Sequence, residues 1–90
     1  MQKITVTLTN PQGLHARPAS LLTKVVKDFK SELYFYKNDV DTKKYQPKSI
    51  LSVMSVGAAK GDQLTFVADG DDEKEALEAI KTFIESGCGE

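Results

Sequence analysis

The first ten residues alternate between apolar and polar side chains, a pattern typical of a β-strand with one buried face. The apolar positions are Ile4, Val6 and Leu8. The segment NPQG at 10–13 ends this strand, because Pro11 has no amide hydrogen to donate and Gly13 accepts a positive φ. The pattern therefore predicts a strand followed by a tight turn.

From residue 16 the apolar spacing becomes three and four residues, which predicts an amphipathic helix. The apolar stripe consists of Leu21, Leu22, Val25, Val26 and Phe29. Pro18 fits a helix only in its first turn, where a missing amide costs little. The helix is therefore expected to begin at His15 or Ala16, which places the single histidine of the chain at a helix start.

The remaining pattern predicts a strand at 32–38, a weaker strand or extended loop at 39–46, and a short helix after Ser49. The pattern then predicts a further strand at 63–68 and a last helix within 69–86. The first turn of this helix is acidic, which suits the positive end of the helix dipole. The apolar faces of the two longer helices must be buried, and a common sheet can cover both. We therefore expect an α+β open-faced sandwich, a four-stranded antiparallel sheet with helices on one face, in the order βαββαβα.

Length and charge narrow the function classes. The 90 residues are expected to form a single domain, 1–90, and 12 basic against 13 acidic residues argue against a general nucleic-acid binder.

The N-terminus lacks the apolar run of a signal peptide and no segment is long enough to insert in a membrane, so we expect a cytoplasmic protein. Cys88 cannot form an intrachain disulfide and is expected in a frayed tail. One histidine and one distant cysteine predict no metal site.

A histidine at a helix start favours phosphate chemistry. The first amides of a helix have no intrahelical acceptor and carry partial positive charge, so they bind anions. Here these are the amides around His15, Ala16, Arg17 and Ala19, since Pro18 has none. The Arg17 guanidinium can bind two phosphate oxygens at once. The residues thus predict a histidine nucleophile beside a phosphate-stabilising helix end.

Other interpretations of this segment are ordinary ones. A lone histidine at a helix start is most often a surface residue or a loose cap, and Arg17 a solvated charge. A Ser20–His15 nucleophilic pair lacks an orienting carboxylate.

Two separated motifs, GLHARPAS and PKSILSVMSVGAAKGD, resemble those of HPr, the histidine-containing phosphocarrier family of the bacterial phosphotransferase system. The resemblance spans nearly the whole chain and implies the HPr fold. It implies that His15 accepts a phosphoryl group on Nδ1 from enzyme I, with Arg17 beside it, and passes the group to IIA domains of sugar permeases. Such a carrier is phosphorylated stoichiometrically and needs no cofactor.

A carrier that serves several partners needs a docking surface and is expected to be a monomer. The residues expected to form this surface near His15 are Ser20, Lys24, Ile50, Leu51 and Met54. The alternative is that the apolar members of this set pack in the core, as is expected for Val53.

Ser49 precedes the short helix, where a serine usually serves as an N-cap. The resemblance implies regulatory phosphorylation at Ser49 by HPr kinase/phosphorylase, and binding of that form to a catabolite-control transcription regulator. The chain departs from the family pattern in a longer segment at 38–48, in Pro47 and in Ser52. These departures concern kinase recognition and partner preference, not His15.

Three other interpretations of the function of this chain remain at this point. A purely regulatory paralogue of the same fold is disfavoured because that paralogue lacks the histidine. A small acylphosphatase-like hydrolase would turn over an acyl phosphate, and a nitrogen-regulatory phosphotransferase branch would share the His15 chemistry.

Overall fold

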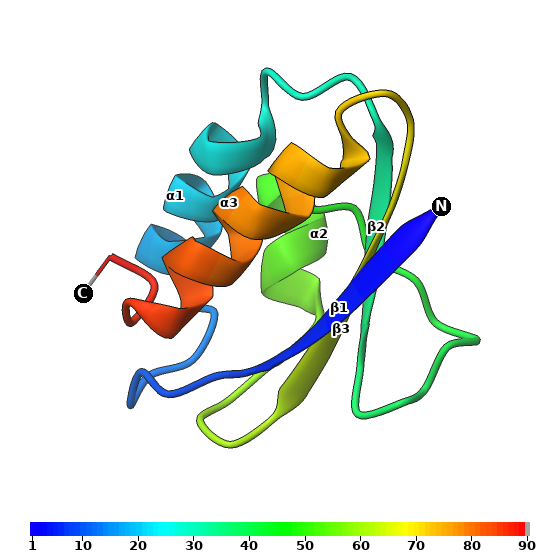
Figure 1. Cartoon of the computed structure of the whole chain (residues 1–90). Helices are drawn as coiled ribbons and strands as arrows, with labels where there is room; N and C mark the ends of the chain where they lie inside the picture. The colour runs from blue at the N-terminus through cyan, green and yellow to red at the C-terminus, as the bar shows by residue number, and fades with distance from the viewer. Residues whose placement is uncertain (90) are drawn as a thin grey trace.

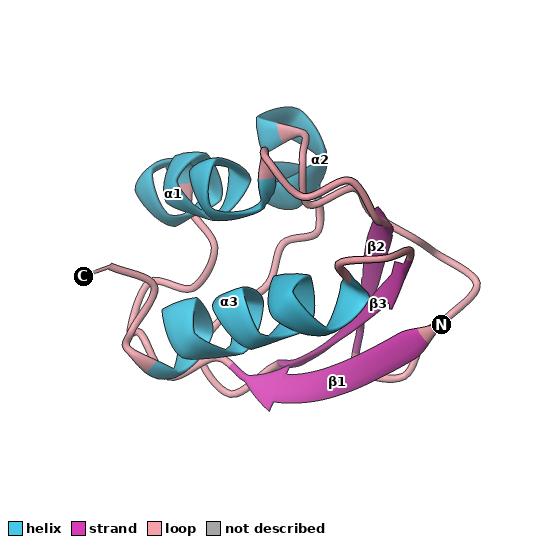
Figure 2. Ribbon diagram, turned by 45° about the horizontal axis from the view of Figure 1, so that its top comes forward, coloured by secondary structure: helices cyan, strands magenta, loops and turns pink. Residues whose placement is uncertain are grey.

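Three strands form one antiparallel sheet, and the last strand of the chain lies at its centre, in the order β1-β3-β2 (Figure 1). The structure is a computed structural model that describes residues 1–89. Its elements are β1 (Gln2–Thr7), α1 (Ala16–Val26), β2 (Glu32–Lys37), α2 (Ile50–Ser55), β3 (Gln63–Asp69) and α3 (Glu73–Glu85). The three helices lie on one side of the sheet (Figure 2). The predicted α+β class with helices on one face is therefore confirmed.

The central strand β3 is buried on both faces. Its helix-facing residues Leu64, Phe66 and Ala68 are fully buried, and the ring of Phe66 stacks on Phe35 of β2 with centroids 4.8 Å apart. Val67, on the opposite face, is only 4% exposed. On this face the side chains of its register partners, Lys3 of β1 and Tyr34 of β2, flank Val67, which explains why β3 contains more buried residues than simple alternation predicts.

The predicted fourth strand is wrong for the part of the chain that the structure describes. Residues 39–46 contribute only an isolated antiparallel bridge, in which Phe35 and Tyr45 exchange backbone hydrogen bonds of 2.9 and 2.8 Å. Asn38 and Asp39 have φ values of 51° and 63°, so the chain turns in the left-handed region where a strand would have to be extended. The observed order is βαβαβα.

The predicted starts of α1 and α2 are confirmed, whereas α1 ends at Val26, so that Phe29 of the predicted stripe lies beyond the helix. α1 begins at Ala16 with His15 as its N-cap and Pro18 in its first turn. Ser49 caps α2, and α3 ends at Glu85, two residues before Gly87. Among residues 1–89, no helix is long and apolar enough to cross a membrane.

The segment after α3 folds back on the molecule, beside the beginning of α1 (Figure 1). Cys88 is fully buried, and its amide donates a 3.0 Å hydrogen bond to the carbonyl of Phe83. A Cβ on Gly89 would lie 2.8 Å from the Leu21 side chain of α1. The expectation that Cys88 lies in a frayed tail is therefore wrong, because the apolar thiol joins the core.

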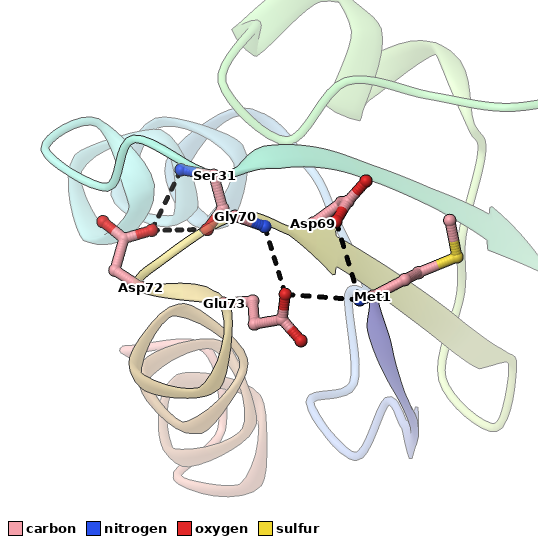
Figure 3. A network of polar contacts seen from close by, with 6 residues as sticks. All are labelled: Met1, Ser31, Asp69, Gly70, Asp72 and Glu73. Atoms are coloured by element: carbon pink, nitrogen blue, oxygen red, sulfur yellow. Dashed lines mark hydrogen bonds and ion pairs between the residues drawn. The ribbon is translucent and has the colours of Figure 1, made fainter.

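Polar contacts fix the start of α3 to β1 and to the beginning of β2 (Figure 3). The Asp72 carboxylate accepts hydrogen bonds from the Ser31 hydroxyl at 2.5 Å and from the Ser31 amide at 2.9 Å. The Glu73 carboxylate accepts from the Gly70 amide at 3.1 Å and lies 3.3 Å from the Met1 amino group. These two carboxylates hold both edge strands of the sheet against the positive end of α3.

Candidate functional site

The turn before α1 is fixed by its own side chains. The buried Asn10 donates from Nδ2 to the Gly13 carbonyl at 2.6 Å, and the Gly13 amide donates to the Asn10 carbonyl at 3.2 Å. Leu14 is buried in the core directly before the histidine. Asparagine commonly closes turns in this way, so the NPQG segment carries the signal for this contact, although Asn10 was not among the predicted site residues.

The same turn packs against the loop that follows α2. The Leu14 amide donates to the Ala58 carbonyl at 3.1 Å. Gly13 has a φ of +65°, and a Cβ there would lie 2.2 Å from the Ala58 oxygen. Only glycine permits this close approach. The loop after α2 therefore sets the position at which α1 begins.

His15 occupies the N-cap of α1 in extended backbone conformation and is half-buried. Its carbonyl accepts a 3.0 Å hydrogen bond from the Ala19 amide, so the expectation that this amide is open to an anion is wrong. Since Pro18 has no amide hydrogen, Ala16 and Arg17 supply the first-turn amides that have no intrahelical acceptor. No acidic residue lies in the first turn of α1, so no carboxylate there offsets the partial positive charge of the helix N-terminus.

α2 packs against α1, and the colours of Figure 1 show that the two helices run in roughly opposite directions. The Thr23 hydroxyl lies 3.4 Å from the Pro47 carbonyl, which places the start of α2 beside the middle of α1. The Ala58 contact places the end of α2 beside the start of α1. The two helices therefore border one continuous surface.

The predicted docking residues lie on these two helices. Leu51 is 81% exposed, and Ile50 and Met54 are 42% and 44% exposed, whereas Val53 is fully buried. On α1, Ser20 is half-buried and Lys24 is exposed one turn later on the same side of the helix. The exposed apolar residues of α2 are thus available at the surface, and Val53 is core, as predicted.

Ser49 caps α2 through its hydroxyl, which accepts a 3.2 Å hydrogen bond from the Ser52 amide. The Ser52 hydroxyl in turn accepts from the Gln46 amide at 2.8 Å. Pro47 is buried, and the Lys48 ammonium donates to the Phe29 carbonyl at 2.5 Å. The unusual Pro47 and Ser52 thus hold the segment that leads into Ser49.

Among residues 1–89, no group of three histidine, cysteine or acidic side chains could hold a metal ion. His15 lies at the N-cap of α1, and Arg17 is exposed in the first turn of the same helix.

Comparison with known proteins gives the family. A sequence model of the family described as "PTS HPr component phosphorylation site" matches residues 2–86. The chain belongs to the HPr family. It is 43% identical over 86 residues to the phosphocarrier protein HPr of Mycoplasma pneumoniae, and the match covers 94% of each chain.

A solved HPr structure supports the same fold. The crystal structure of HPr-C-His from Thermoanaerobacter tengcongensis superimposes with a TM-score of 0.89 and 40% identity, covering 100% of this chain and 98% of that one. HPr sequences also occur within longer proteins. The chain is 36% identical over 83 residues to the multiphosphoryl transfer protein of Haemophilus influenzae, covering 92% of this chain but only 17% of that relative.

Proposed function

We propose that this HPr-family protein is a phosphocarrier of the sugar phosphotransferase system, which accepts a phosphoryl group on His15 from phospho-enzyme I and donates it to IIA domains. The observation that carries this proposal is the place of the single histidine, at the N-cap of α1 with Arg17 in the first turn. The family match and the 43% identity to a phosphocarrier HPr support it.

The transfer needs a nucleophile and stabilisation of the charge on the moving group. Imidazole Nδ1 of His15 attacks phosphorus, the bond between phosphorus and enzyme I breaks, and that bonding pair returns to enzyme I. The Arg17 guanidinium and the amides of Ala16 and Arg17 stabilise the equatorial oxygens. Donation to a IIA domain is the same displacement in the opposite sense, so no water and no cofactor take part.

A carrier must not hold the phosphoryl group too tightly. A half-buried histidine supported by one arginine and two amides binds the group moderately, and each partner completes the transition-state surroundings in turn. We propose that partners dock on the surface that α1 and α2 share, through Ser20, Lys24, Ile50, Leu51 and Met54. A monomer in the cytoplasm, with residues 1–90 as one domain, fits this role.

We further propose that phosphorylation of Ser49 regulates this carrier, through HPr kinase/phosphorylase and a catabolite-control transcription regulator. The supporting observation is that Ser49 directly precedes the exposed Ile50 and Leu51, so a phosphate there adds about two negative charges to the docking surface. Phosphorylation also replaces the hydroxyl that accepts from Ser52 with oxygens that accept more strongly.

Intact mass after incubation with phosphoenolpyruvate, Mg²⁺ and enzyme I tests the main proposal. We expect a gain of one phosphoryl group that is labile to acid, stable to alkali and absent in His15→Ala. Ser49→Ala is the matched control and should be phosphorylated normally. No gain with an enzyme I that phosphorylates another HPr would contradict the proposal, and catalytic release of phosphate from an acyl phosphate would favour the hydrolase reading.

A further inference from the structure

The sheet ends at β1, whose outer edge carries no further strand among the described residues 1–89. β1 pairs only with β3, so the edge that faces away from β3 is open (Figure 1). The strand QKITVT contains no proline and no glycine, so its whole backbone is suited to pairing. Such an edge presents amides and carbonyls to which a further strand can bind.

The hydrogen-bond register shows which residues of β1 face this open edge. The amide and the carbonyl of Phe35 in β2 both bond to Tyr45, so they point away from β3. Bonded and non-bonded pairs alternate in an antiparallel ladder, so Phe66, opposite Phe35, directs its groups to Ile4 of β1. The amides and carbonyls that point outward from β1 are therefore those of Lys3, Thr5 and Thr7.

Helix α3 covers β1 and presents charged side chains toward the same edge. A hollow of about 200 Å³ between the two is lined by Gln2, Ile4, Lys74, Leu77, Glu78 and Lys81. The three charged residues of this lining and Glu85 lie four, three and four positions apart, which places them on one side of the helix, and all four are exposed. The charges alternate from positive to negative along this α3 charge row, which consists of Lys74, Glu78, Lys81 and Glu85.

The α3 charge row is complementary to a second one that runs in the opposite direction. Lys74 then lies opposite Glu85 of the second copy, and Glu78 lies opposite Lys81 of the second copy. Two-fold symmetry repeats both contacts. A parallel, in-register alignment would instead place like charges together, so the order of charges favours the reversed alignment.

β1 and α3 impose the same alignment on a pair of molecules. Glu73 at the start of α3 lies 3.3 Å from the Met1 amino group, and strand and helix then run in the same general direction (Figure 2). Antiparallel strands therefore bring antiparallel helices. From that common start, rises of about 3.3 Å per strand residue and about 1.5 Å per helix residue bring Thr5 within about one turn of the middle of the charge row.

The spacing of the two layers also agrees. α3 packs on both β1 and β3. Two sheets joined through strands about 4.8 Å apart therefore place the two copies of α3 roughly 10 Å apart, which is the usual distance between packed helices. The strands and the charge rows can thus pair at the same time.

Pairing of two β1 strands about Thr5 brings no like charges together. Thr5 lies opposite Thr5 of the second copy, and directly opposed threonines are a favourable cross-strand pair. Lys3 lies opposite Thr7 of the second copy. Continuing this register places Met1, with its ion pairs, opposite Thr9 of the second copy.

We propose that this edge binds a second copy of the chain, through antiparallel pairing of the two β1 strands and of the two α3 charge rows. The contact is small, so we expect a Kd on the order of 100 µM to 1 mM. The docking surface of α1 and α2 lies on the side of the molecule away from β1 and stays open in the pair (Figure 2). Phosphoryl transfer needs no second copy, so the monomeric carrier and the pair are two states of one chain, related by concentration.

Sedimentation equilibrium of the full chain between about 20 µM and about 2 mM measures this association. We expect a monomer–dimer equilibrium that weakens with salt, because exposed ion pairs are screened. Lys81→Glu and Glu78→Lys should each weaken it about tenfold, since each places like charges opposite one another twice. Lys27→Glu reverses an exposed charge at the C-cap of α1 and should associate like the wild type.

A mixture of the Lys81→Glu and Glu78→Lys variants tests the alignment itself. In the mixed pair every reversed charge meets an opposite charge, so the mixture should associate more tightly than either variant alone. The Thr5 amide should also exchange with deuterium more slowly at high protein concentration, because it becomes bonded across the pair.

Three results would overturn the proposal. Absence of a dimer at about 2 mM would leave the edge to an extended peptide of another protein. Equal association of the wild type and all three variants would place the contact elsewhere on the molecule. A mixture that associates no more tightly than its components would refute the reversed alignment. Amide spectra of the dilute variants show that each is folded.

Discussion

The backbone amide of Leu14 donates a 3.1 Å hydrogen bond to the carbonyl of Ala58, so the residue before the histidine is attached to the loop that follows α2. Segments more than forty positions apart in the chain thus jointly fix the start of α1. Any change that separates these two backbones should therefore alter both stability and the presentation of His15.

Gly13→Ala and Gly57→Ala form a matched pair that measures this contact. Both glycines have a left-handed φ, +65° and +67°, but only at Gly13 would a Cβ meet the Ala58 oxygen. We expect Gly57→Ala to lower the free energy of unfolding by about 1 kcal/mol and Gly13→Ala by roughly 3 kcal/mol. Urea unfolding at neutral pH measures both, and equal losses would show that the close approach has no energetic weight.

Arg17→Lys should slow phosphoryl transfer without destabilising the fold. Lysine keeps the positive charge but loses the planar fork that binds two oxygens. We expect a rate loss on the order of tenfold for Arg17→Lys and 100-fold for Arg17→Ala, measured by rapid quench with phospho-enzyme I. Lys27→Ala, which removes an exposed lysine at the C-cap of α1 and outside the proposed docking surface, should leave the rate nearly unchanged. Similar losses for Lys27→Ala and Arg17→Ala would contradict a specific role of Arg17.

Leu51→Asp and Val53→Ala should separate docking from folding. Leu51 is 81% exposed, so its replacement should change the free energy of unfolding by no more than about 0.5 kcal/mol while weakening the affinity for enzyme I about tenfold. Val53 is fully buried, and its truncation should cost roughly 2 kcal/mol. Isothermal titration calorimetry and urea unfolding measure the two effects. Unchanged affinity in Leu51→Asp would remove α2 from the proposed docking surface.

Asp72 should make stability depend on acid pH. The Ser31 hydroxyl, followed by the Lys30 amide, lowers the pKa of Asp72 below its ordinary value of 3.8. A depressed folded-state pKa stabilises the fold at pH values above 3.8, and this contribution is lost as the pH falls through the folded-state pKa.

Asp72→Asn should therefore flatten the loss of stability with acid, measured by urea unfolding between about pH 2.5 and 6. The stability of Asp72→Asn should still fall somewhat with acid, because the Ala59 amide lowers the pKa of Asp62 and the Gly70 amide lowers that of Glu73. Asp71→Asn, at an exposed neighbouring position, is the control. An identical pH slope in wild type and Asp72→Asn would refute the assignment.

Local signals in the sequence were sufficient to predict where α1 and α2 begin, but not how many strands the sheet contains. Pro18 and the apolar stripe fixed the start of α1, and Ser49 fixed that of α2, because caps and prolines act within a few residues. The predicted fourth strand does not form because Asn38 and Asp39 adopt left-handed backbone conformations. The pattern of apolar residues does not indicate such a turn.

The candidate site shows the same division between local and distant contacts. The position of His15 followed from neighbouring residues, whereas its attachment to Ala58 joins loops that no local pattern connects. The burial of Cys88 similarly depends on a chain reversal that places Gly89 against Leu21. Contacts between distant segments are thus what the pattern of residues left undetermined.

The order of the strands has a consequence for synthesis on the ribosome. β3 pairs with both β1 and β2, so two strands that are made early have no partner until residues 63–69 have left the exit tunnel. The Ala58 carbonyl that holds the turn before α1 also emerges late. The nascent chain therefore completes its sheet and sets its histidine in place only after β3 has emerged, and until then β1 and β2 are exposed to wrong partners.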